Sequence, residues 1–419
     1  MSARAEILTI GDEILYGQTL DTNSHWMSSE LDKIGIKVIR KTTVPDLEEE
    51  ITGAFAEAEK RADIVLITGG LGPTNDDLTK PCLAKFFGVE MVMNEEALEE
   101  LKELYQRAGW ELSKLNEAQA IQPKGAARIT NTLGTAPGIW YEKEGTIFIS
   151  MPGVPFEMKG MMEKEILPKL RARFLKGQIH HRIIRTGGIP ESKLAEKLAD
   201  WEAKLPSHIK LAFLPTLAQV KLRLTATGQD EEQLKKDVQE QIDKGLPLIE
   251  KYVYATENID LEERVGQMLR EQNKTIACAE SCTGGYLSHL LTSIPGSSDY
   301  FQGSYIAYSY AIKEKALQVD HKVLEEQGAV SEEVVIQMAE NVRKVFGTSI
   351  GVSLSGIAGP GGATKDKPVG TVWIAYSDEN GTEARKFIFA KDRKLNIQLS
   401  AMVALNIVRS KLNGKEFIS

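Results

Sequence analysis

The sequence predicts an α/β protein made of two doubly wound α/β domains joined by a smaller α+β module. Two observations support this fold class. Apolar strands alternate with amphipathic helices up to about residue 170, and the same alternation returns after residue 256. The stretch between them has long strands of mostly antiparallel character instead. Because 419 residues are too many for one ordinary core, we expect three domains, at 1–170, 171–255 and 256–419.

The first segment shows its strand and helix signals in the order that a parallel sheet requires. We expect strands at 5–11, 36–44, 63–70 and 145–151. A helix should start at Asn23 or Ser24 and end at Gly35, and another should cover 46–62. Each strand runs into a loop that contains Gly, Pro or Asp, so polar loops should gather at one edge of the sheet.

The middle and last segments follow two different patterns. In the middle segment, strands are expected at 181–188, 209–228 and 248–256, with helices at 191–205 and 230–246. In the last segment, the expected strands are 275–280, 304–309, 350–359 and 370–378. The middle segment carries few residues suited to catalysis, which favours a connector or association domain.

Composition limits the classes of function. A hydrophobic share of 42% and a charged share of 26% are typical of a globular protein. We expect a cytoplasmic protein with no membrane partner, because no apolar run approaches the about 18 residues of a membrane span and no leader pattern is present. The net charge of −8 argues against a general nucleic-acid-binding surface. The 3 cysteines fit a reducing compartment, and the 6 scattered histidines imply that any metal is held by carboxylates.

The first candidate site is acidic and lies at the ends of the predicted strands. The loop "ITGGLGPTNDDLT" offers backbone N–H groups of Gly69, Gly70 and Gly72 to a phosphate. Asp76 and Asp77 follow that loop, and Asp46 and Glu13 could join them from neighbouring strands. Carboxylates beside a phosphate site suggest a divalent cation that bridges pyrophosphate oxygens. The alternative is that Asp76 or Asp77 only caps the next helix.

The second candidate site is the stretch "CAESCTGG" at 278–285, where a strand meets a glycine turn that opens a helix. Cys278, Ser281 and Cys282 are all able to act as nucleophiles. The turn leaves free backbone N–H groups, which suits nucleophilic attack with a stabilised oxyanion. The same geometry suits simple anion binding, so this stretch alone does not decide between them.

The acidic motifs, together with "NTLGTAPG" and "MPGVPFEM", resemble the N-terminal domain of the CinA family (competence/damage-inducible protein A). That domain is similar to the molybdopterin-binding proteins of molybdenum-cofactor biosynthesis. The resemblance spans residues 5–170 and implies functional roles for Asp46 and Asp77. It also implies cleavage of ADP-ribose with a divalent cation (Mg, Mn or Co), for which Asp77, Asp46 and Glu13 are the expected ligands.

The motifs "AESCTGG", "YSYAIK" and "SGIAGPGG" resemble the C-terminal domain of the same family, over roughly 259–413. That domain is the nicotinamide mononucleotide (NMN) deamidase, which forms nicotinate mononucleotide and ammonia. The resemblance implies Ser281 as the nucleophile, Lys313 as the base and Tyr308 as a relay or orienting group. The expected substrate-binding residues are Thr283, Gly284, Gly285, Gly356, Gly359, Gly361, Gly362 and Arg393. Of these, the Thr283 and Gly284 amides could face the oxyanion, and the later glycines and Arg393 could hold the phosphate.

Some alternatives stay open within this resemblance. Cys282 is a possible nucleophile, although no histidine lies in these loops to serve it, and Glu280 could orient the site or only end the strand. Relatives usually carry "YSNEAK" and a second arginine near the last helix. This chain departs from that pattern at Tyr310, Ala311, Ile312 and Ile397. If the missing arginine grips phosphate, the expected substitutes are Lys365, Lys367 and Arg385.

The middle segment resembles the KH-like linking domain of full-length CinA proteins. It lacks the basic GxxG loop that clamps RNA, because "RTGGIPES" places Glu191 beside its glycines. We therefore do not expect nucleic acid as a partner. The leading hypothesis is a homodimeric, bifunctional hydrolase of pyridine-nucleotide salvage with NMN and ADP-ribose as substrates. The rival is an adaptor that binds nucleotides or molybdopterin, with one or both sites inactive.

Overall fold

The computed structural model describes residues 3–74, 76–175 and 177–415. The outermost positions of the two predicted end domains, and Asn75 of the acidic motif, lie outside these described residues. Within the described parts, no helix has both the length and the apolar character needed to cross a bilayer.

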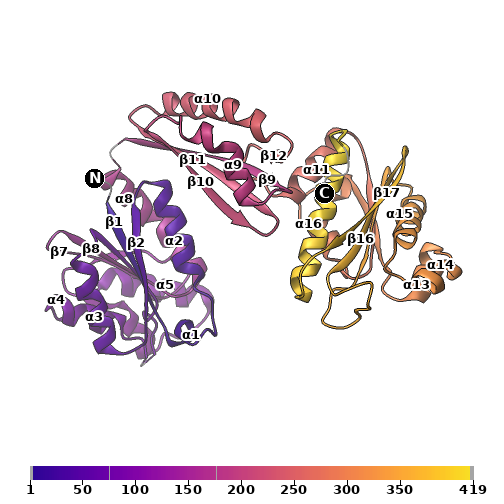
Figure 1. Ribbon diagram of the computed structural model, residues 1–419. Coiled ribbons are helices and arrows are strands. Elements are labelled where there is room, and N and C mark those ends of the chain that lie inside the picture. The colour runs from indigo at the N-terminus through magenta and orange to yellow at the C-terminus, as the bar shows by residue number, and fades with distance from the viewer. Residues whose placement is uncertain (1–2, 75, 176, 416–419) are drawn as a thin grey trace. The chain divides into compact units, whose positions relative to one another are not determined.

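The chain divides into two compact units. The first contains Met1–Ile179 with Gly228–Glu231, and the second contains His180–Thr227 with Glu232–Ser419. Three larger sheets follow one another along the chain, each with its own helices (Figure 1). This arrangement confirms the predicted α/β fold class with a small α+β module between two α/β domains.

The sheet of the first unit has the strand order β2-β1-β3-β8-β7-β6. Its strands are β1 (Arg4–Ile10), β2 (Lys37–Val44), β3 (Ile64–Thr68), β6 (Ala127–Ile129), β7 (Gly138–Lys143) and β8 (Thr146–Met151). The neighbours from β2 to β8 are parallel, whereas β7 and β6 add an antiparallel edge. The parallel strands are the ones that the sequence alternation predicts, so their polar loops lie at one edge.

Helices cover both faces of this sheet. One face carries α2 (Thr22–Lys33), α7 (Pro155–Met161), η2 (Met162–Ile166) and α8 (Leu167–Phe174). The other carries α3 (Glu48–Glu59) and α4 (Thr79–Phe87). Successive residues of a strand point to opposite faces, so Ile7 and Leu8 of β1 enter different cores. Strands buried on both faces are apolar at nearly every position, which explains their strong sequence signal.

Shorter elements complete the first unit. They are α1 (Asp12–Leu15), β4 (Met91–Met93), α5 (Glu95–Ala108), α6 (Lys114–Glu117), η1 (Ala118–Ala120) and β5 (Ile121–Pro123). β4 and β5 form a separate antiparallel pair. The predicted start of α2 is close but not correct, because the helix begins at Thr22. Asp21 caps it by accepting a hydrogen bond from the Ser24 amide at 2.9 Å.

The small module contains a sheet in the order β10-β11-β9-β12. Its elements are β9 (Gln178–Gly187), α9 (Glu191–Glu202), β10 (Ile209–Thr216), β11 (Gln219–Gly228), α10 (Glu231–Ile249) and β12 (Val253–Ala255). The strand predicted at 248–256 is wrong at its start, since α10 continues to Ile249. Val238, Ile242 and Ile249 are buried on one face of that helix, so the helical period outweighs the apolar run.

The sheet of the last domain has the order β14-β13-β15-β16-β17. Its strands are β13 (Ile276–Glu280), β14 (Phe301–Ile306), β15 (Ile350–Gly356), β16 (Thr371–Asp378) and β17 (Gly381–Ile388). β14, β13 and β15 are parallel, and β16 and β17 are antiparallel. The sequence analysis did not predict β17, because this edge strand mixes charged residues such as Glu383 and Arg385 with few apolar ones.

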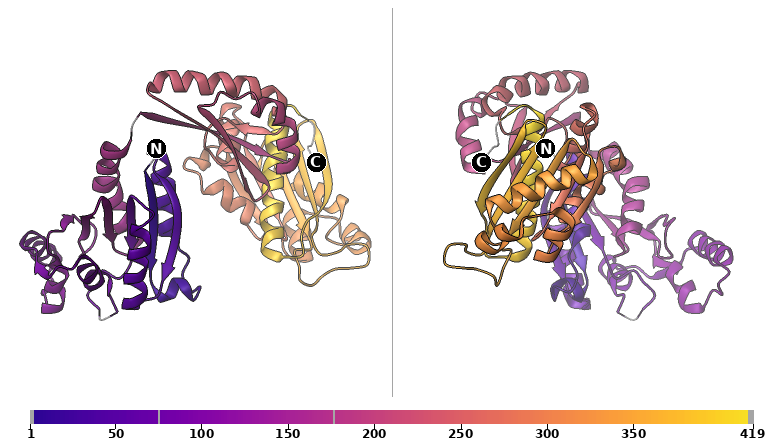
Figure 2. Two further views of the ribbon diagram at one scale, coloured as in Figure 1. Left: turned by 60° about the vertical axis from the view of Figure 1, so that its left-hand side comes forward. Right: turned by 90° about the vertical axis from the view of Figure 1, so that its right-hand side faces the viewer.

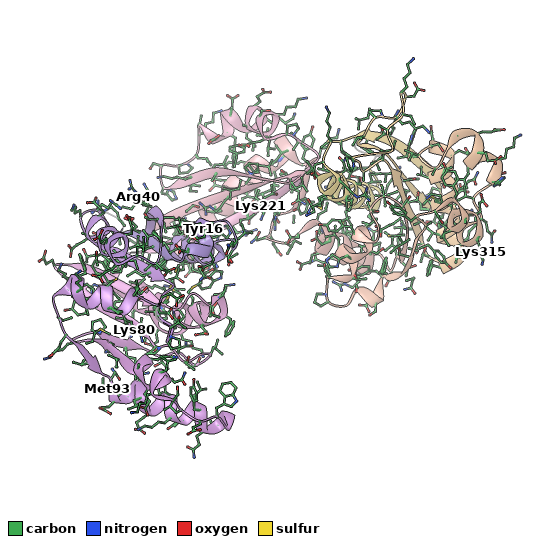
Figure 3. All side chains as sticks on the ribbon, turned by 90° about the horizontal axis from the view of Figure 1, so that it is seen from below. Tyr16, Arg40, Lys80, Met93, Lys221 and Lys315 are labelled. Atoms are coloured by element: carbon green, nitrogen blue, oxygen red, sulfur yellow. The ribbon has the colours of Figure 1, made fainter. Side chains whose placement is uncertain are left out.

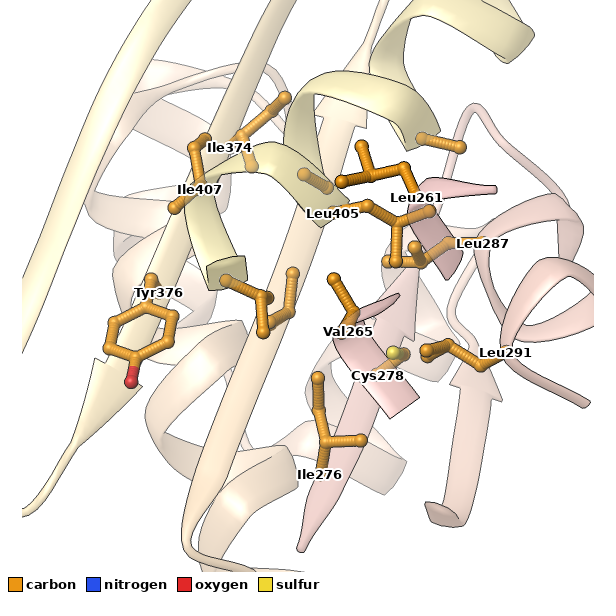
Figure 4. Packing of buried hydrophobic residues seen from close by; sticks show 14 of the residues in the cluster. Leu261, Val265, Ile276, Cys278, Leu287, Leu291, Ile374, Tyr376, Leu405 and Ile407 are labelled. Atoms are coloured by element: carbon orange, nitrogen blue, oxygen red, sulfur yellow. The ribbon is translucent and has the colours of Figure 1, made fainter. Parts of the chain in front are cut away.

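Helices cover both faces of this last sheet. They are α11 (Leu261–Glu271), α12 (Tyr286–Thr292), η3 (Ser297–Asp299), α13 (Tyr310–Leu317), α14 (His321–Gln327), α15 (Glu332–Phe346) and α16 (Arg393–Leu412). α16 and α15 lie on opposite faces (Figures 1 and 2). The core beneath α11 and α16 includes Val265, Ile276, Leu291 and Leu405 (Figure 4). The second candidate site lies at the carboxyl ends of the parallel strands, where α12 follows β13 and α13 follows β14.

Candidate active sites

The serine site forms where β13 ends and the chain turns into α12. Ser281 is the first residue of this turn, and its backbone N–H donates to the Leu354 carbonyl at 3.0 Å. Gly284 and Gly285 have φ angles of 61° and 99°, a left-handed region that only glycine adopts readily. The turn is therefore sharp, and it leaves Ser281 at the sheet edge with 8% of its surface exposed.

Lys313 reaches Ser281 from α13. Its Nζ lies 3.0 Å from Ser281 Oγ, 2.5 Å from the Ala307 carbonyl and 3.4 Å from the Tyr308 carbonyl. The lysine has no exposed surface. Burial lowers the pKa of Lys313 to about 8, and the nearby Cys282 thiol only partly opposes that shift.

These contacts prepare Lys313 to act as a base toward Ser281. Carbonyl oxygens only accept hydrogen bonds, so the N–H bonds of a neutral Lys313 amine can point to Ala307 and Tyr308. The remaining lone pair then faces the Ser281 hydroxyl. A base whose pKa lies near neutrality, hydrogen-bonded to a hydroxyl, is the arrangement that activates a nucleophilic serine.

The cysteines do not compete with Ser281 in this structure. Burial raises the pKa of the Cys282 thiol to about 12, so it stays protonated at neutral pH. Cys278 lies inside the hydrophobic core, near Val265 and Leu291 (Figure 4), and its thiol pKa is raised by burial as well. Both thiols act as packing groups here.

Glu280 orients the turn rather than only ending β13. Its fully buried carboxylate accepts hydrogen bonds from the amides of Gly285 and Leu287, each at 3.1 Å, and from the Ser288 amide at 2.9 Å. The Ser288 hydroxyl donates to it as well. A carboxylate that binds the first amides of a helix stabilises that helix terminus. Glu280 therefore holds the residues that follow Ser281 in one conformation.

The two amides that were expected to face an oxyanion, those of Thr283 and Gly284, differ in their hydrogen bonding. The Gly284 amide donates to the Ser281 carbonyl at 3.1 Å, so the turn itself engages it. Among the described residues, the Thr283 amide has no backbone acceptor, and its buried hydroxyl oxygen has no partner. Thr283 is 3% exposed, and an unpartnered buried hydroxyl is costly unless a ligand completes it.

A second polar cluster stands near Lys313. Arg393, the first residue of α16, donates to the Gly359 carbonyl at 2.8 Å and to the Tyr308 hydroxyl at 3.1 Å. The Tyr308 hydroxyl thus contacts Arg393 and not Lys313. Because the backbone carbonyl of Tyr308 accepts from Lys313, this residue contacts both Lys313 and Arg393.

The glycines of the "GIAGPGG" loop have unequal roles. Gly359 and Gly362 have φ angles of 94° and 87°, which the loop conformation requires. The side of Gly361 where a Cβ would stand is open. Gly356 instead packs tightly, since a Cβ there would lie 2.5 Å from Val372 Cγ2. Gly356 is accordingly a packing residue, and so is Gly359, where a Cβ would lie 2.7 Å from Val369 Cγ1; the open backbone lies at Gly361 and Gly362.

The residues that depart from the family pattern, and the expected phosphate-binding substitutes, differ in their surroundings. The Tyr310 hydroxyl accepts from the Ala329 amide at 3.2 Å, and Ile397 packs against the hydrophobic core. Lys367 donates to the Gln327 carbonyl at 2.7 Å, so it braces the loop. The remaining positions are exposed or lie along an edge strand: Ala311, Ile312, Lys365 and Arg385.

The acidic site is a cavity of about 470 Å³ at the carboxyl edge of the first sheet. Its lining contains every residue that the sequence analysis placed there: Glu13, Asp46, Gly69, Gly70, Gly72, Asp76 and Asp77. Tertiary structure thus brings together loops that follow β1, β2 and β3. Residues from the 135–136 and 152–157 loops close the other side.

Carboxylates in this cavity repel one another. The Asp46 pKa is raised, first by burial and further by the charges of Asp12, Glu13 and Asp76. Asp46 accepts a hydrogen bond from the Asp12 amide at 3.1 Å. Asp12 Oδ1 is buried and has no partner among the described residues. The unpartnered Asp12 oxygen lies beside Asp46, whose ionised form is disfavoured by its neighbours. Two such carboxylates are an environment that fits a bound cation.

A cation here would need ligands from its substrate or from water. Among the described residues, no three carboxylate, histidine or cysteine side chains are grouped closely enough to hold a metal by themselves. Hard divalent cations such as Mg²⁺ normally retain waters and bind substrate phosphates, so two protein carboxylates suffice. Asp46 and Asp77 line the cavity, and Asp12 lies next to Asp46, to which its amide donates.

Asp77 does not cap the next helix. α4 begins at Thr79, and its N-cap position, Leu78, has no side-chain hydrogen bond among the described residues. Asp77 instead accepts from the Thr74 amide at 2.9 Å and from the Thr74 hydroxyl. A Cβ at position 72 would lie 2.5 Å from Asp77 Oδ2, so Gly72 makes room for this carboxylate. The capping alternative is therefore wrong for Asp77.

The Gly69–Gly70 turn is required sterically. Their φ angles are 110° and 62°, and a Cβ on Gly69 would lie 2.1 Å from the Ile10 carbonyl oxygen. The Gly69 amide donates to the Met151 carbonyl at 3.1 Å. Its N–H group is therefore engaged and does not point freely at a phosphate.

Lys80 is a functional candidate that sequence reasoning missed. It lies within the first unit (Figure 3), is 7% exposed, and donates to the Gln119 carbonyl at 2.5 Å. Burial lowers the pKa of Lys80 to about 8, while the charge of Asp77 opposes that shift. The sequence did offer one sign of this residue, because Lys80 follows Asp77 by three positions at the start of a mostly buried helix.

The comparisons with known proteins cover the whole chain. A CinA-like protein of Cytophaga hutchinsonii is 53% identical over 97% of this chain and 98% of its own length. Another, from Amoebophilus asiaticus, is 44% identical over 98% of this chain and 100% of its own. The chain belongs to the CinA family.

Three family matches follow one another along this CinA family member. Residues 6–172 match the probable molybdopterin binding domain, 181–255 match the damage-inducible protein CinA KH domain, and 258–412 match the CinA C-terminal domain. Among solved structures, the protein CinA from Thermoplasma acidophilum is 34% identical, with 41% of this chain and 98% of that chain covered and a TM-score of 0.38. The three family matches and the CinA-like relatives confirm the resemblance drawn from the sequence motifs.

Proposed function

We propose that the C-terminal domain is a serine amidohydrolase that converts NMN to nicotinate mononucleotide and ammonia. The observation that supports this proposal is the 3.0 Å contact between the buried Lys313 Nζ and Ser281 Oγ. Neither residue needs a metal or a histidine for such chemistry, since a neutral lysine can remove the hydroxyl proton. The pKa of about 8 makes that neutral form accessible near physiological pH.

In the first half of the reaction, Lys313 Nζ takes the proton of Ser281 while Oγ attacks the amide carbon of NMN. The carbonyl oxygen gains the negative charge, and the Thr283 amide is the donor available to stabilise it. The carbon–nitrogen bond then breaks, and the Lys313 ammonium passes its proton to the leaving nitrogen. Ammonia departs and leaves an ester on Ser281.

In the second half, a water molecule attacks the ester carbon and Lys313 takes its proton. The carbon–oxygen bond to Ser281 breaks, and the lysine returns the proton to Oγ. Nicotinate mononucleotide is released and the resting site is restored. Arg393 supplies positive charge for the 5′-phosphate, with open backbone at Gly361 and Gly362 beside it.

For the N-terminal domain, we propose hydrolysis of ADP-ribose to AMP and ribose 5-phosphate with a divalent cation. Asp46 and Asp12, with Asp77, would hold the cation, which would neutralise pyrophosphate charge when bound. The carboxylate cluster with its unpartnered Asp12 oxygen supports this proposal. The match to a probable molybdopterin binding domain supports a second candidate, a site that binds a nucleotide or molybdopterin without turnover.

Two assays on the purified full-length protein test these proposals. Incubation with NMN should release ammonia in proportion to nicotinate mononucleotide, and chelator should not prevent it. Incubation with ADP-ribose should form AMP only when Mg²⁺, Mn²⁺ or Co²⁺ is added. Absence of ammonia would contradict the first proposal. ADP-ribose binding without AMP formation would support the adaptor instead of the pyrophosphatase.

A further inference from the structure

A cavity of about 430 Å³ lies between the small module and α16, within the second unit. The turn of the "RTGGIPES" motif at 187–191, the β10–β11 turn and α16 line it. Its walls are mainly apolar, with side chains that include Ile189, Val220, Phe387, Met402 and Val403. Small-molecule sites are concave, mostly apolar and of about 300–1,000 Å³, and contain a few convergent polar groups.

Two amide side chains supply the polar groups of this cavity. Asn406 and Gln219 both line it. Asn406 Oδ1 accepts from Arg409 Nε at 3.0 Å, and Gln219 Oε1 accepts from the Tyr254 hydroxyl at 2.9 Å. Because the oxygens are engaged, the NH₂ groups remain, and neither has a partner among the described residues. Both groups are donors, so they favour a ligand with acceptor oxygens.

The charges behind these amides also favour an anion. Arg409 and Arg185 are 1% and 4% exposed. Arg185 pairs with Asp260 at 2.7 Å, whereas Arg409 contacts only neutral acceptors, Asn406 and the Val253 carbonyl. Arg409 Nη2 and Arg185 Nε are buried without a partner among the described residues. Asp260 and Glu262 lie near the same cluster, but no hydrogen-bond partner of Arg409 that the structure describes carries a charge that would neutralise it.

We propose that this cavity binds a small aromatic carboxylate, with the carboxylate on the Asn406 and Gln219 amides and the ring among the apolar walls. The Phe387 and Phe389 rings lie parallel, with centroids 5.7 Å apart, and both belong to the cavity wall. Flat aromatic ligands pack well against such rings and against the Met402 thioether. Glu191 is the one carboxylate in the lining, and it is exposed to solvent.

The site is separate from the serine site, although α16 belongs to both. Arg393 begins this helix and contacts Tyr308, whereas Asn406 lies about 20 Å further along at 1.5 Å per residue. A ligand in the cavity therefore does not require NMN turnover. Its binding can be tested whether or not the deamidase proposal is correct.

The test is titration of the full-length protein with 2-naphthoate, followed by calorimetry. We expect saturable binding, with about tenfold weaker binding of the uncharged 2-methylnaphthalene. Asn406→Asp keeps the acceptor for Arg409 but places a carboxylate where the donor was, so it should weaken 2-naphthoate binding at least about tenfold. Asn380→Asp makes the same change on an exposed turn and should leave binding unaltered.

A second variant and a second measurement locate the ligand. Val403→Phe fills the cavity and should abolish 2-naphthoate binding, while its thermal melt reports whether the protein still folds. In protein labelled with ¹³C-methyl methionine, 2-naphthoate should shift the Met402 methyl signal and not that of Met91. No binding by about 1 mM, equal binding to Asn406→Asp, or equal affinity for the uncharged compound would overturn the proposal.

Discussion

The serine site and the acidic site respond in opposite directions to the same physical effect. Burial disfavours the charged form of any side chain. For Lys313 this lowers the pKa to about 8 and produces a base. For Asp46 it raises the pKa, and neighbouring carboxylates raise it further. The functions proposed above follow this difference: protein atoms alone would act at the serine site, whereas a cation would complete the acidic site.

The partners of the key residues show the same difference. Lys313 is held by the Ala307 and Tyr308 carbonyls and lies 3.0 Å from Ser281 Oγ, and Glu280 fixes the turn that carries Ser281. Next to Asp46 of the acidic cavity, Asp12 Oδ1 stays without a partner among the described residues. A preorganised site loses its function when one group is removed. A site completed by an ion depends as strongly on the ion as on its residues.

Removal of the serine nucleophile should give the largest effect. Ser281→Ala should lower NMN deamidation by about 10⁴-fold, because no other group can form the ester. NMN binding, measured by calorimetry, should persist since Arg393 and the 359–362 loop are unchanged. Cys282→Ala is the matched control and should retain most of the activity. An inactive Cys282→Ala protein with a normal melting temperature would reverse the assignment.

Replacement of the base tests whether Lys313 removes a proton or only supplies charge. Lys313→Arg should lower kcat by about 10³-fold, because a guanidinium with a pKa above about 12 does not deprotonate near neutrality. Arg393→Lys keeps a cation near the phosphate and should mainly raise KM. If Lys313→Arg changed KM alone, Lys313 would belong to substrate binding.

In the acidic site, charge removal should lower activity without lowering stability. Asp46→Asn and Asp77→Asn should each reduce ADP-ribose cleavage by about 100-fold, and excess chelator should have a comparable effect on the unaltered protein. The melting temperature of Asp46→Asn should stay equal or rise, because a repelled carboxylate is lost. NMN deamidation should persist in each case. A fall in melting temperature with unchanged cleavage would indicate a structural role.

The pH dependence of NMN deamidation should be the smallest of these effects. The neutral form of Lys313 increases as pH rises through about 8, so deamidation should increase about tenfold between pH 7 and pH 9 and then level off. The pH profile of Ser281→Cys should differ from this one, because the introduced thiol would itself titrate. A deamidation rate that falls over this interval would exclude a lysine base of lowered pKa.

Much of the fold was predictable because strands buried on both faces have a strong apolar signal. This signal located the strands β1, β3 and β13, which lead into the two sites. The Gly-Gly motifs that follow β3 and β13 then located the turns beside Asp77 and Ser281. The sequence did not predict the edge strand β17 or the continuation of α10 to Ile249. An edge strand needs few apolar residues, and the identity of a short apolar run depends on what packs against it.

The sequence by itself determined which residue types occur at the strand ends, and its motifs were sufficient for the family. Only the tertiary structure decided what those residues do. It showed that Glu280 holds the turn, that Gly284 donates within it, and that Asp77 binds Thr74 rather than capping α4. It also placed Asp12 and Lys80 beside the acidic cavity. The physical reason is that hydrogen bonds and burial are formed between distant segments, and both pKa values and free donors depend on them.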